Sequence, residues 1–245
     1  MAVLVTRPQP DDEATASSLR ARGFDALKAP MLRFEAVAFQ DDADARYGAV
    51  IVSSANALRG IETQLSGSRL LKLPLFAVGE RTTTAARDLG FANVIVAGGD
   101  ATSLRDLVLK SAKAKELKKA SPLLYLAGAD LARDLSGELG ERGFTVVTHT
   151  TYRMAAVPAL PRETCEAFAA NGIEAVLHYS RRSARAFLEA ARSAGVEISA
   201  LSLPQCCISD AVATVVRDAG AAQIYVAASP DENALFGALD RALRR

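Results

Sequence analysis

Short apolar runs alternate with longer amphipathic segments along the whole chain. Runs such as 2–6, 48–53 and 74–78 are five or six residues long and mostly apolar, as buried strands are. The segments between them place apolar residues every three or four positions and therefore predict helices. The predicted strands are 2–6, 24–29, 48–53, 74–78, 93–97, 123–127, 144–149, 174–179, 205–208 and 222–227, and the predicted helices include 10–22, 55–65, 80–89 and 102–118.

The sequence repeats itself in the same order along its two halves. The tripeptide Arg-Gly-Phe at 22–24 recurs 120 positions later, segment 49–54 resembles the segment 126 positions later, and segment 87–90 resembles the one 130 positions later. Loop insertions would produce such slowly growing offsets. The chain is therefore predicted to be a tandem of two similar halves that meet near Ser121 and Pro122.

Strands that alternate with helices predict an α/β fold, in which helices cover both faces of a parallel sheet. We expect two similar doubly wound parallel-sheet domains, joined by a two-stranded β-ribbon. The ribbon is predicted from segments 31–39 and 148–157, which alternate apolar and polar residues or are rich in β-branched ones, as half-exposed strands are. The pattern alone also allows two consecutive domains, 1–121 and 122–245.

The composition predicts no general attraction for nucleic acid or for an anionic membrane. Lys and Arg number 29 against 28 Asp and Glu, which leaves a formal net charge of +1. No stretch approaches the ~20 apolar residues that span a bilayer, and the chain enters an apolar run at Ala2 without a basic segment before it. We therefore expect a soluble cytoplasmic protein. The three cysteines are an odd number, and we expect them to be reduced packing residues.

Several common chemistries lack their residue signatures. The chain has two histidines and no Cys-x-x-Cys, which disfavours a metal site. It also lacks the glycine-rich motifs of dinucleotide and P-loop nucleotide sites, and the Gly-x-Ser-x-Gly turn of serine hydrolases. We expect neither a metal nor an organic cofactor.

Small polar residues recur where predicted strands end and helices begin. Such turns expose the first backbone N–H groups of the helix, whose dipole favours negative charge. In parallel sheets these turns share the carboxyl edge, where ligands bind. We expect a polyanionic, carboxylate-bearing ligand in a cleft that both domains share; the alternative is that these residues are ordinary helix N-caps. The turns are 53–56, 79–82, 98–103, 128–130, 180–183 and 209–211.

The motifs at 3–8, 51–57, 76–82 and 142–144, the last leading to Thr151 and Tyr152, resemble those of the uroporphyrinogen-III synthase family across essentially the whole chain. The resemblance implies discontinuous domains. One would comprise 1–33 with 156–245 and the other 37–150, with 34–36 and 151–155 as the crossing linker strands. It further implies that hydroxymethylbilane loses water and closes into a macrocycle with its terminal ring inverted, through azafulvene and spiro intermediates and without a cofactor.

The resemblance implies one catalytic residue, Tyr152, as the phenol that assists loss of the hydroxyl; the alternative is a ribbon tyrosine that covers apolar surface. The turn at Ser209 departs from the family pattern, because it lacks the glycine and threonine expected there and carries Asp210. Its role in binding is correspondingly in doubt. The implied substrate-binding residues are Arg7, Ser53, Ser54, Asn56, Thr82, Gly128, Ser180, Arg181 and Ser209.

The implied partner is a linear tetrapyrrole with acetate and propionate groups. We also expect a monomer that makes transient contact with hydroxymethylbilane synthase. Two other functions stay open. A two-domain receptor could close on a small anionic ligand without transforming it, since the chain has no strongly acidic or basic catalytic dyad. A glycosyl or nucleotide-sugar transferase is disfavoured by the missing phosphate loops and the absence of tryptophan.

Overall fold

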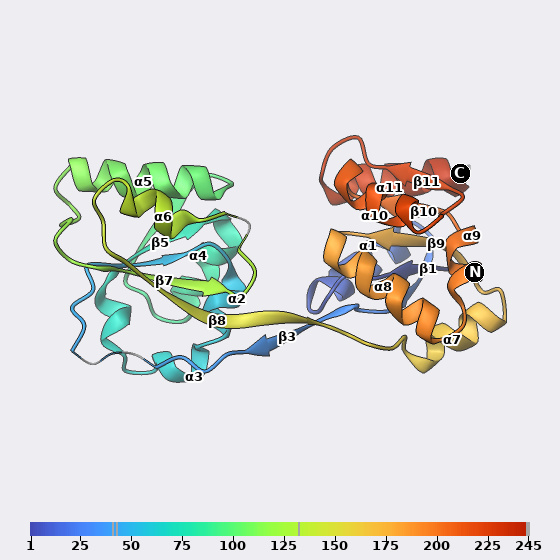
Figure 1. The fold of residues 1–245 in the computed structure, drawn as a ribbon, viewed down its shortest axis with the longest axis horizontal. Coiled ribbons are helices and arrows are strands. Elements are labelled where there is room, and N and C mark those ends of the chain that lie inside the picture. The colour runs from blue at the N-terminus through green and yellow to red at the C-terminus, as the bar shows by residue number, and fades with distance from the viewer. Residues whose placement is uncertain (41, 43, 132, 244–245) are drawn as a thin grey trace. The chain divides into compact units, whose positions relative to one another are not determined.

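The computed structural model describes residues 1–40, 42, 44–131 and 133–243. Internal contacts divide the chain into two compact units (Figure 1). Unit 1 joins Met1–Phe34 to Ala155–Arg245, and unit 2 is Glu35–Met154. The assignment of independent domains stays a prediction. Among the described residues, no helix is both long enough and apolar enough to cross a bilayer.

Unit 1 is built on a five-stranded sheet in which all neighbouring strands are parallel. Its central strands alternate their side chains between two cores. Val3 and Val5 pack with α1 and α11, and Leu4 points to the opposite face. The strand order is β11 (Ile224–Val226), β10 (Gln205–Cys207), β9 (Ile173–His178), β1 (Ala2–Val5) and β2 (Asp25–Lys28).

The helices of unit 1 lie on both faces of this sheet (Figure 1). One face is covered by α1 and α11, whose Leu19, Leu235 and Phe236 are buried against the strands. The three cysteines are free thiols, and those of Cys206 and Cys207 are buried in β10. The helices are α1 (Asp11–Ala21), α7 (Arg162–Ala169), α8 (Arg181–Ser193), α9 (Glu197–Ser202), α10 (Asp210–Asp218) and α11 (Glu232–Leu243).

Unit 2 is built on a second sheet with two cores, one on each face. Val50 and Val52 of β4 enter one core, and Ala49 and Ile51 enter the other. Such alternation explains why the strands read as continuous apolar runs, since both faces are buried. The strand order is β3 (Leu32–Ala36), β8 (Val146–Ala156), β7 (Leu123–Gly128), β4 (Ala49–Val52), β5 (Pro74–Val78) and β6 (Asn93–Ala97), and the pairs from β8 to β6 are parallel.

Different helices cover the two faces of the second sheet. Leu58 of α2 and Ala86 of α4 belong to one core, whereas Leu104 of α5 and Leu139 of α6 belong to the other. Doubly wound α/β layers on two parallel sheets confirm the predicted fold class. The helices are α2 (Ala55–Arg59), α3 (Glu62–Leu65), a short 3₁₀ helix (Arg69–Lys72), α4 (Gly79–Asp88), α5 (Ala101–Lys113) and α6 (Leu135–Gly140).

The sequence repeat relates the two sheets strand by strand. The order β2-β1-β9-β10-β11 in unit 1 corresponds to β8-β7-β4-β5-β6 in unit 2. Registers correspond as well: Val3 is opposite Ala175 in unit 1, and Leu123 is opposite Ala49 in unit 2, as offsets of 120 and 126 require. The opening β-α-β unit of each sequence half therefore lies in the sheet of the other half.

The ribbon predicted from segments 31–39 and 148–157 consists of β3 and β8, which are neighbours in the sheet. The backbone N–H of Val37 donates to the carbonyl of Thr151 at 2.9 Å, and that of Val157 donates to the carbonyl of Met31 at 2.9 Å. Because the partner number falls as the residue number rises, the two strands are antiparallel. The predicted strand 144–149 and the predicted ribbon segment 148–157 form one continuous strand, β8, from Val146 to Ala156.

The predicted helix 55–65 is wrong, because the structure has two short helices there, α2 and α3. The hydroxyl of Thr151 donates to the carbonyl of Ala57 at 2.9 Å. The N–H of Ile61 would use that carbonyl in an α-helix, but it donates instead to the carbonyl of Leu58 at 3.0 Å. At Gly60 a side chain would collide with the Thr151 backbone. The passing β8 strand thus interrupts the helix.

The predicted helix 102–118 also ends earlier than expected, at Lys113. Lys115 adopts a left-handed backbone conformation with φ of 61°, which an α-helix does not tolerate. The turn brings Leu117 into the core, where it is only 4% exposed. Burial of that side chain outweighs the local helix preference of the lysine-rich segment.

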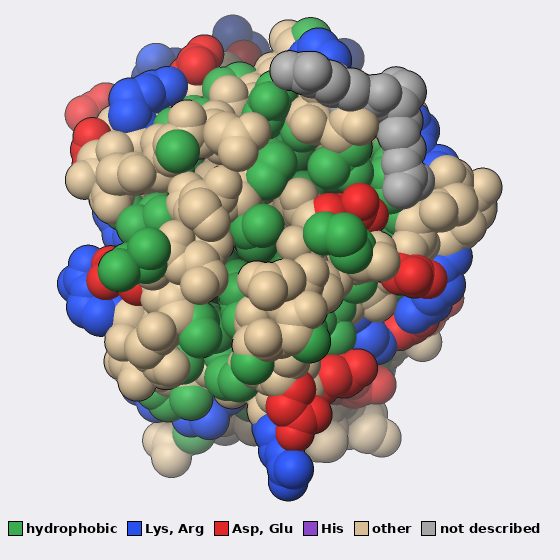
Figure 2. Space-filling view, turned by 90° about the vertical axis from the view of Figure 1, so that its right-hand side faces the viewer, with side chains coloured by type: hydrophobic (Ala, Val, Ile, Leu, Met, Phe, Trp, Pro, Cys, Tyr) green, Lys and Arg blue, Asp and Glu red, His purple; other side chains and the backbone are tan. Residues whose placement is uncertain are grey.

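One end of unit 1, which carries the N-terminus and α9, exposes apolar side chains. Figure 2 looks onto this face, where hydrophobic side chains gather in the middle and charged ones lie mostly at the margins. Met1 is 69% exposed and Ile198 is 87% exposed. A hollow of about 200 Å³ beside Met1 is lined by Phe168, Ile173 and Leu203, among others.

His178 is the most unusual polar group of the unit 1 core. Its side chain is fully buried at the end of β9, with its ring 5.5 Å from that of Phe187. Gln205 donates its amide hydrogens to the carbonyls of Ala200 and Leu203, so its oxygen accepts from His178 Nε2 at 2.8 Å. Nδ1 has no partner among the described residues. Burial lowers the pKa of His178 to about 4.

We predict that unit 1 loses stability as the pH falls from 6.5 to about 4. In this range the unfolded chain binds a proton at His178, whose ordinary pKa is 6.5, and the folded chain does not. The loss should be about 3 kcal/mol from this group. Urea unfolding at several pH values measures it. The variant His178→Asn should flatten this dependence, and His149→Asn should not; an unchanged slope in His178→Asn would contradict the assignment.

Candidate functional site

The carboxyl edge of the unit 2 sheet gathers five of the predicted residues. Because β4, β7 and β8 are parallel, the last residues of β4 and β7 lie at one edge, which β8 passes at Tyr152 before it ends at Ala156. Ser53 follows β4 directly, and Gly128 at the end of β7 is opposite Tyr152 of β8. Ser54 and Asn56 open the adjoining helix α2. We call these residues, Ser53, Ser54, Asn56, Gly128 and Tyr152, the edge site.

Gly128 is required by the position of the Tyr152 ring. The pairing of β7 with β8 shifts between Ala127 and Gly128, which places Tyr152 opposite Gly128. A Cβ atom on Gly128 would lie 2.7 Å from Cζ and 2.9 Å from the hydroxyl oxygen of Tyr152. The N–H of Ala129 donates to the Tyr152 carbonyl at 2.9 Å. Backbone contacts and a missing side chain thus fix the phenol at the sheet edge.

Tyr125 reaches the same edge, and no motif of the sequence predicts a role for it. Its hydroxyl shares a hydrogen bond of 3.0 Å with the Ser53 hydroxyl. Both residues continue the same face, since Ile51 and Tyr125 lie in one core. The pKa of Tyr125 is raised above its ordinary value, chiefly by burial. The hydrogen bond to Ser53 lowers the pKa in part, and nearby Tyr152 adds to the rise. Tyr125 is therefore a neutral phenol that orients Ser53.

Ser54 and Ser180 act as helix caps in this structure. The Ser54 hydroxyl accepts from the N–H of Asn56 at 3.3 Å. Its repeat counterpart, Ser180, accepts from the N–H of Ser183 at 3.1 Å. These contacts match the N-cap alternative and leave the remaining polar atoms of both turns for other roles.

Of the predicted turns, the two that open α4 and α10 have no side-chain cap. The residue before α4 is Val78, and the residue before α10 is Ser209, whose side chain makes no capping hydrogen bond. Thr82 lies inside α4 and is 5% exposed, so it is not a cap. The two helices are repeat counterparts, and their first N–H groups are the ones that an anion would satisfy.

Arg7 is held by carboxylates of its own unit. Its guanidinium lies 3.0 Å from Glu232 and 3.3 Å from Asp11, and it packs over the Tyr179 ring at 4.6 Å. Glu232 also accepts from the hydroxyls of Thr15 at 2.5 Å and Tyr179 at 2.8 Å. This network ties β1 and α1 to α11. Asp11 and Glu232 thus already pair with the guanidinium of Arg7, which the resemblance implied would bind the substrate.

The structure thus places the predicted residues in two groups. The edge site and Thr82 belong to unit 2, whereas Arg7, Ser180, Arg181 and Ser209 belong to unit 1. Arg181 is exposed at the first position of α8. The edge site and neighbouring Tyr125 together offer two phenols and the hydroxyls of Ser53 and Ser54. The start of α4 adds helix N–H groups without a side-chain cap. Such a set can bind carboxylates and donate a proton to a leaving oxygen.

Residues 13–237 match the profile of the family described as uroporphyrinogen-III synthase HemD. No curated protein sequence matches the chain significantly. The matched family consists of enzymes, so the receptor alternative gains no support.

Two solved structures share the fold over nearly the whole chain. A uroporphyrinogen-III synthetase from Helicobacter pylori has 18% identity and a TM-score of 0.65, and the match covers 99% of each chain. A mutant uroporphyrinogen III synthase from the extremely thermophilic bacterium Thermus thermophilus has 17% identity and a TM-score of 0.57, over 100% of this chain and 99% of that one. At these identities the likeness shows the fold.

We predict that Ser53 and Tyr125 are energetically coupled. Ser53→Ala, Tyr125→Phe and the double variant form a double-mutant cycle, in which removal of the shared hydrogen bond should give a coupling free energy of about 0.5–1.5 kcal/mol. Urea unfolding of the four proteins measures it. Additive effects of the two substitutions would show that the hydroxyls do not interact.

Proposed function

The chain belongs to the uroporphyrinogen-III synthase family, and on this premise we propose that it converts hydroxymethylbilane into uroporphyrinogen III as a hydro-lyase. The observation that carries the proposal is the family match over residues 13–237, which spans both units. Membership makes the chain an enzyme of tetrapyrrole biosynthesis.

The reaction needs orientation more than strong acid–base chemistry. The nitrogen electron pair of the first ring expels the terminal hydroxyl, which leaves as water and gives an azafulvene. The substituted carbon of the terminal ring then attacks, and the resulting spiro intermediate fragments and recloses with that ring inverted. Attack by the unsubstituted carbon would give the uninverted isomer. The protein must therefore hold a flexible chain in one geometry.

Helix starts without side-chain caps support this part of the proposal. The substrate carries acetate and propionate groups, and the open N–H groups of α4 suit carboxylates. The equivalent start of α10, after Ser209, offers the same chemistry in unit 1, although the first-turn carboxylate of Asp210 opposes an anion there. Thr82 would line the α4 start, and the remaining polar atoms of Ser54, Asn56 and Ser180 would add donors.

Tyr152 is the side chain that we propose to act on the leaving hydroxyl. A phenol is an O–H donor at neutral pH and can protonate or hydrogen-bond the departing oxygen. Its support is positional, because Gly128 and the β7–β8 pairing hold the ring at the edge that also carries Ser53. Arg7 is better explained as a structural link within unit 1, since Glu232 and Asp11 already engage it.

The instability of the substrate motivates a further part of the proposal. Hydroxymethylbilane closes to the uninverted isomer without help. We therefore propose that the enzyme receives it through transient contact with hydroxymethylbilane synthase. We further propose that the enzyme is monomeric and cytoplasmic. Rapid transfer would limit the competing closure.

We predict that the purified protein yields the type III isomer from hydroxymethylbilane generated in the assay. No metal or nucleotide should be needed, because the proposed steps use only donors of the chain. Oxidation of the products followed by chromatographic separation of the isomers provides the measurement. Formation of type I alone, at the rate seen without protein, would refute the proposed function and favour a receptor.

We predict that Tyr152→Phe lowers kcat by about 10²–10⁴-fold, as loss of a proton donor does, with little change in KM. Tyr225→Phe is a matched control, because Tyr225 is a half-buried strand tyrosine of unit 1 and lies outside the edge site. Thermal unfolding should show both variants folded. A turnover of Tyr152→Phe equal to that of the control would remove the phenol from the chemistry.

A further inference from the structure

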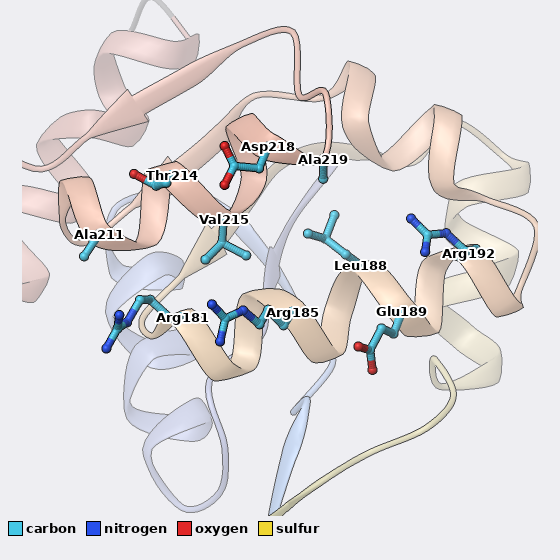
Figure 3. Close-up of a pocket in the computed structure, with 10 residues that line it drawn as sticks. All are labelled: Arg181, Arg185, Leu188, Glu189, Arg192, Ala211, Thr214, Val215, Asp218 and Ala219. Atoms are coloured by element: carbon cyan, nitrogen blue, oxygen red, sulfur yellow. The ribbon is translucent and has the colours of Figure 1, made fainter. Parts of the chain in front are cut away.

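None of the reaction steps proposed above uses the groove between α8 and α10 of unit 1. It forms a cavity of about 550 Å³, within the range of about 300–1,000 Å³ common for small-molecule sites. Figure 3 shows side chains of both helices directed into it. The lining residues are Arg181, Arg185, Leu188, Glu189, Arg192, Ala211, Thr214, Val215, Asp218 and Ala219.

The middle of the groove is apolar. Leu188 of α8 and Val215 of α10 point toward each other between the helices, with Ala219 beside them (Figure 3). Leu188 is 7% exposed and Val215 is half-buried, so both are anchored in the helix layer. These side chains offer a surface on which a flat ring can lie.

The end of the groove near Ala211 and Thr214 is cationic (Figure 3). Arg181 and Arg185 lie one helical turn apart on α8, and both are exposed. Neither has a hydrogen bond or ion pair within the part of the chain that the structure describes. Arg192 differs, because Glu197 binds its guanidinium at 2.6 Å. The guanidinium groups of Arg181 and Arg185 are therefore available to an external anion.

The acidic residues of the groove restrict where that anion fits. Asp218 lies near the apolar middle, and Glu189 lies on α8 toward the end that carries Arg192 (Figure 3). These two negative charges disfavour a carboxylate in the middle of the groove and at the end that carries Arg192. The anion is therefore directed to the end that carries Arg181 and Arg185.

We propose that this groove binds a flat ring that carries two carboxylate arms on adjacent ring atoms. The ring lies on Leu188 and Val215, and each arm meets one guanidinium. Side chains four positions apart on a helix are about 5–6 Å apart at Cβ, a spacing that two short arms can match. Arginine binds carboxylates through two parallel hydrogen bonds, which favours this geometry over a single point charge.

The repeat gives the groove no equivalent in unit 2. The counterparts of Arg181, Leu188 and Val215 are Ala55, Glu62 and Ala85. In addition, α2 ends at Arg59, so the partner helix is too short to form such a groove. The groove is therefore not a by-product of the fold, because the same fold in unit 2 is built without it.

Under the proposed function, the natural ligand of this groove is a pyrrole ring of the substrate or product with its acetate and propionate arms. That identification rests on the proposed function, whereas ring and carboxylate binding does not. The isomer assay tests catalysis, and a binding assay tests the groove. A negative result in the isomer assay therefore does not decide whether the groove binds a ring with carboxylates, and a negative result in the binding assay does not decide whether the protein makes the type III isomer.

The probe is 1,2-phenylenediacetate, a benzene ring with two adjacent carboxylate arms, titrated while backbone amide signals are followed by NMR. Saturable shifts should appear at the groove residues. Adipate has the same chain of atoms between its carboxylates without the ring, and phenylacetate has the ring with one arm. Both should bind at least about 10-fold more weakly, since each lacks one half of the proposed contact.

The double variant Arg181→Gln/Arg185→Gln should weaken binding of the probe by at least about 10-fold. Arg217→Gln is the matched control, an exposed arginine of α10 that does not line the groove. Equal binding by the double variant, or equal binding of adipate, would overturn the proposal. So would an acidic peptide that shifts the groove signals when the probe does not, because the groove would then be a protein-docking surface.

If the groove holds a ring of the substrate during turnover, KM for hydroxymethylbilane should be about 10-fold higher in the double variant than in the unaltered enzyme, with kcat nearly unchanged. Arg217→Gln should change neither constant. If the probe binds in the groove but KM stays the same, the groove does not serve the tetrapyrrole, and its assignment to a pyrrole ring fails.

Discussion

The hydrogen-bonded register of parallel strands determines where every residue of the edge site lies. In unit 2 the pairing of β7 with β8 sets Gly128 opposite Tyr152, and the pairing of β7 with β4 brings Tyr125 beside Ser53. A slip of one residue would turn each of these side chains to the other face. The two buried cores prevent that slip, since Val50 and Ile51 must enter opposite sides of the sheet.

The sequence predicted most of the fold because the repeat and the apolar runs are properties of neighbouring residues. It failed where a distant segment decides the outcome. Helix 55–65 is interrupted by a hydroxyl from Thr151, about 90 positions away. The helix predicted over 102–118 ends at Lys113 because the chain turns there to bury Leu117 in the core. The small polar residues of the turns could be chosen from the sequence as candidates for ligand binding. Whether Ser54 caps a helix, or Arg7 is already paired with carboxylates, depends on the three-dimensional structure.

Tyr125 shows what the sequence could have revealed. Its repeat counterpart is Val5, so a phenol stands where the other half has an aliphatic side chain. Such differences between matched positions mark where the two units have diverged. Unit 2 concentrates phenols and hydroxyls at its edge, whereas unit 1 has arginines along α8. A shared scaffold therefore presents two distinct chemistries, and fold likeness alone would not separate them.

The exchange of opening β-α-β units also orders events during synthesis. Strand β1 leaves the ribosome well before its neighbour β9, which begins at Ile173, so β1 cannot complete its pairing until that distant segment has been made. Unit 2 lies between these parts as one uninterrupted stretch, Glu35–Met154, and can assemble while the C-terminal part is still being translated. Before β9 has been made, the edge of β1 that later pairs with it is unpaired. Contact with a chaperone would matter most during this interval.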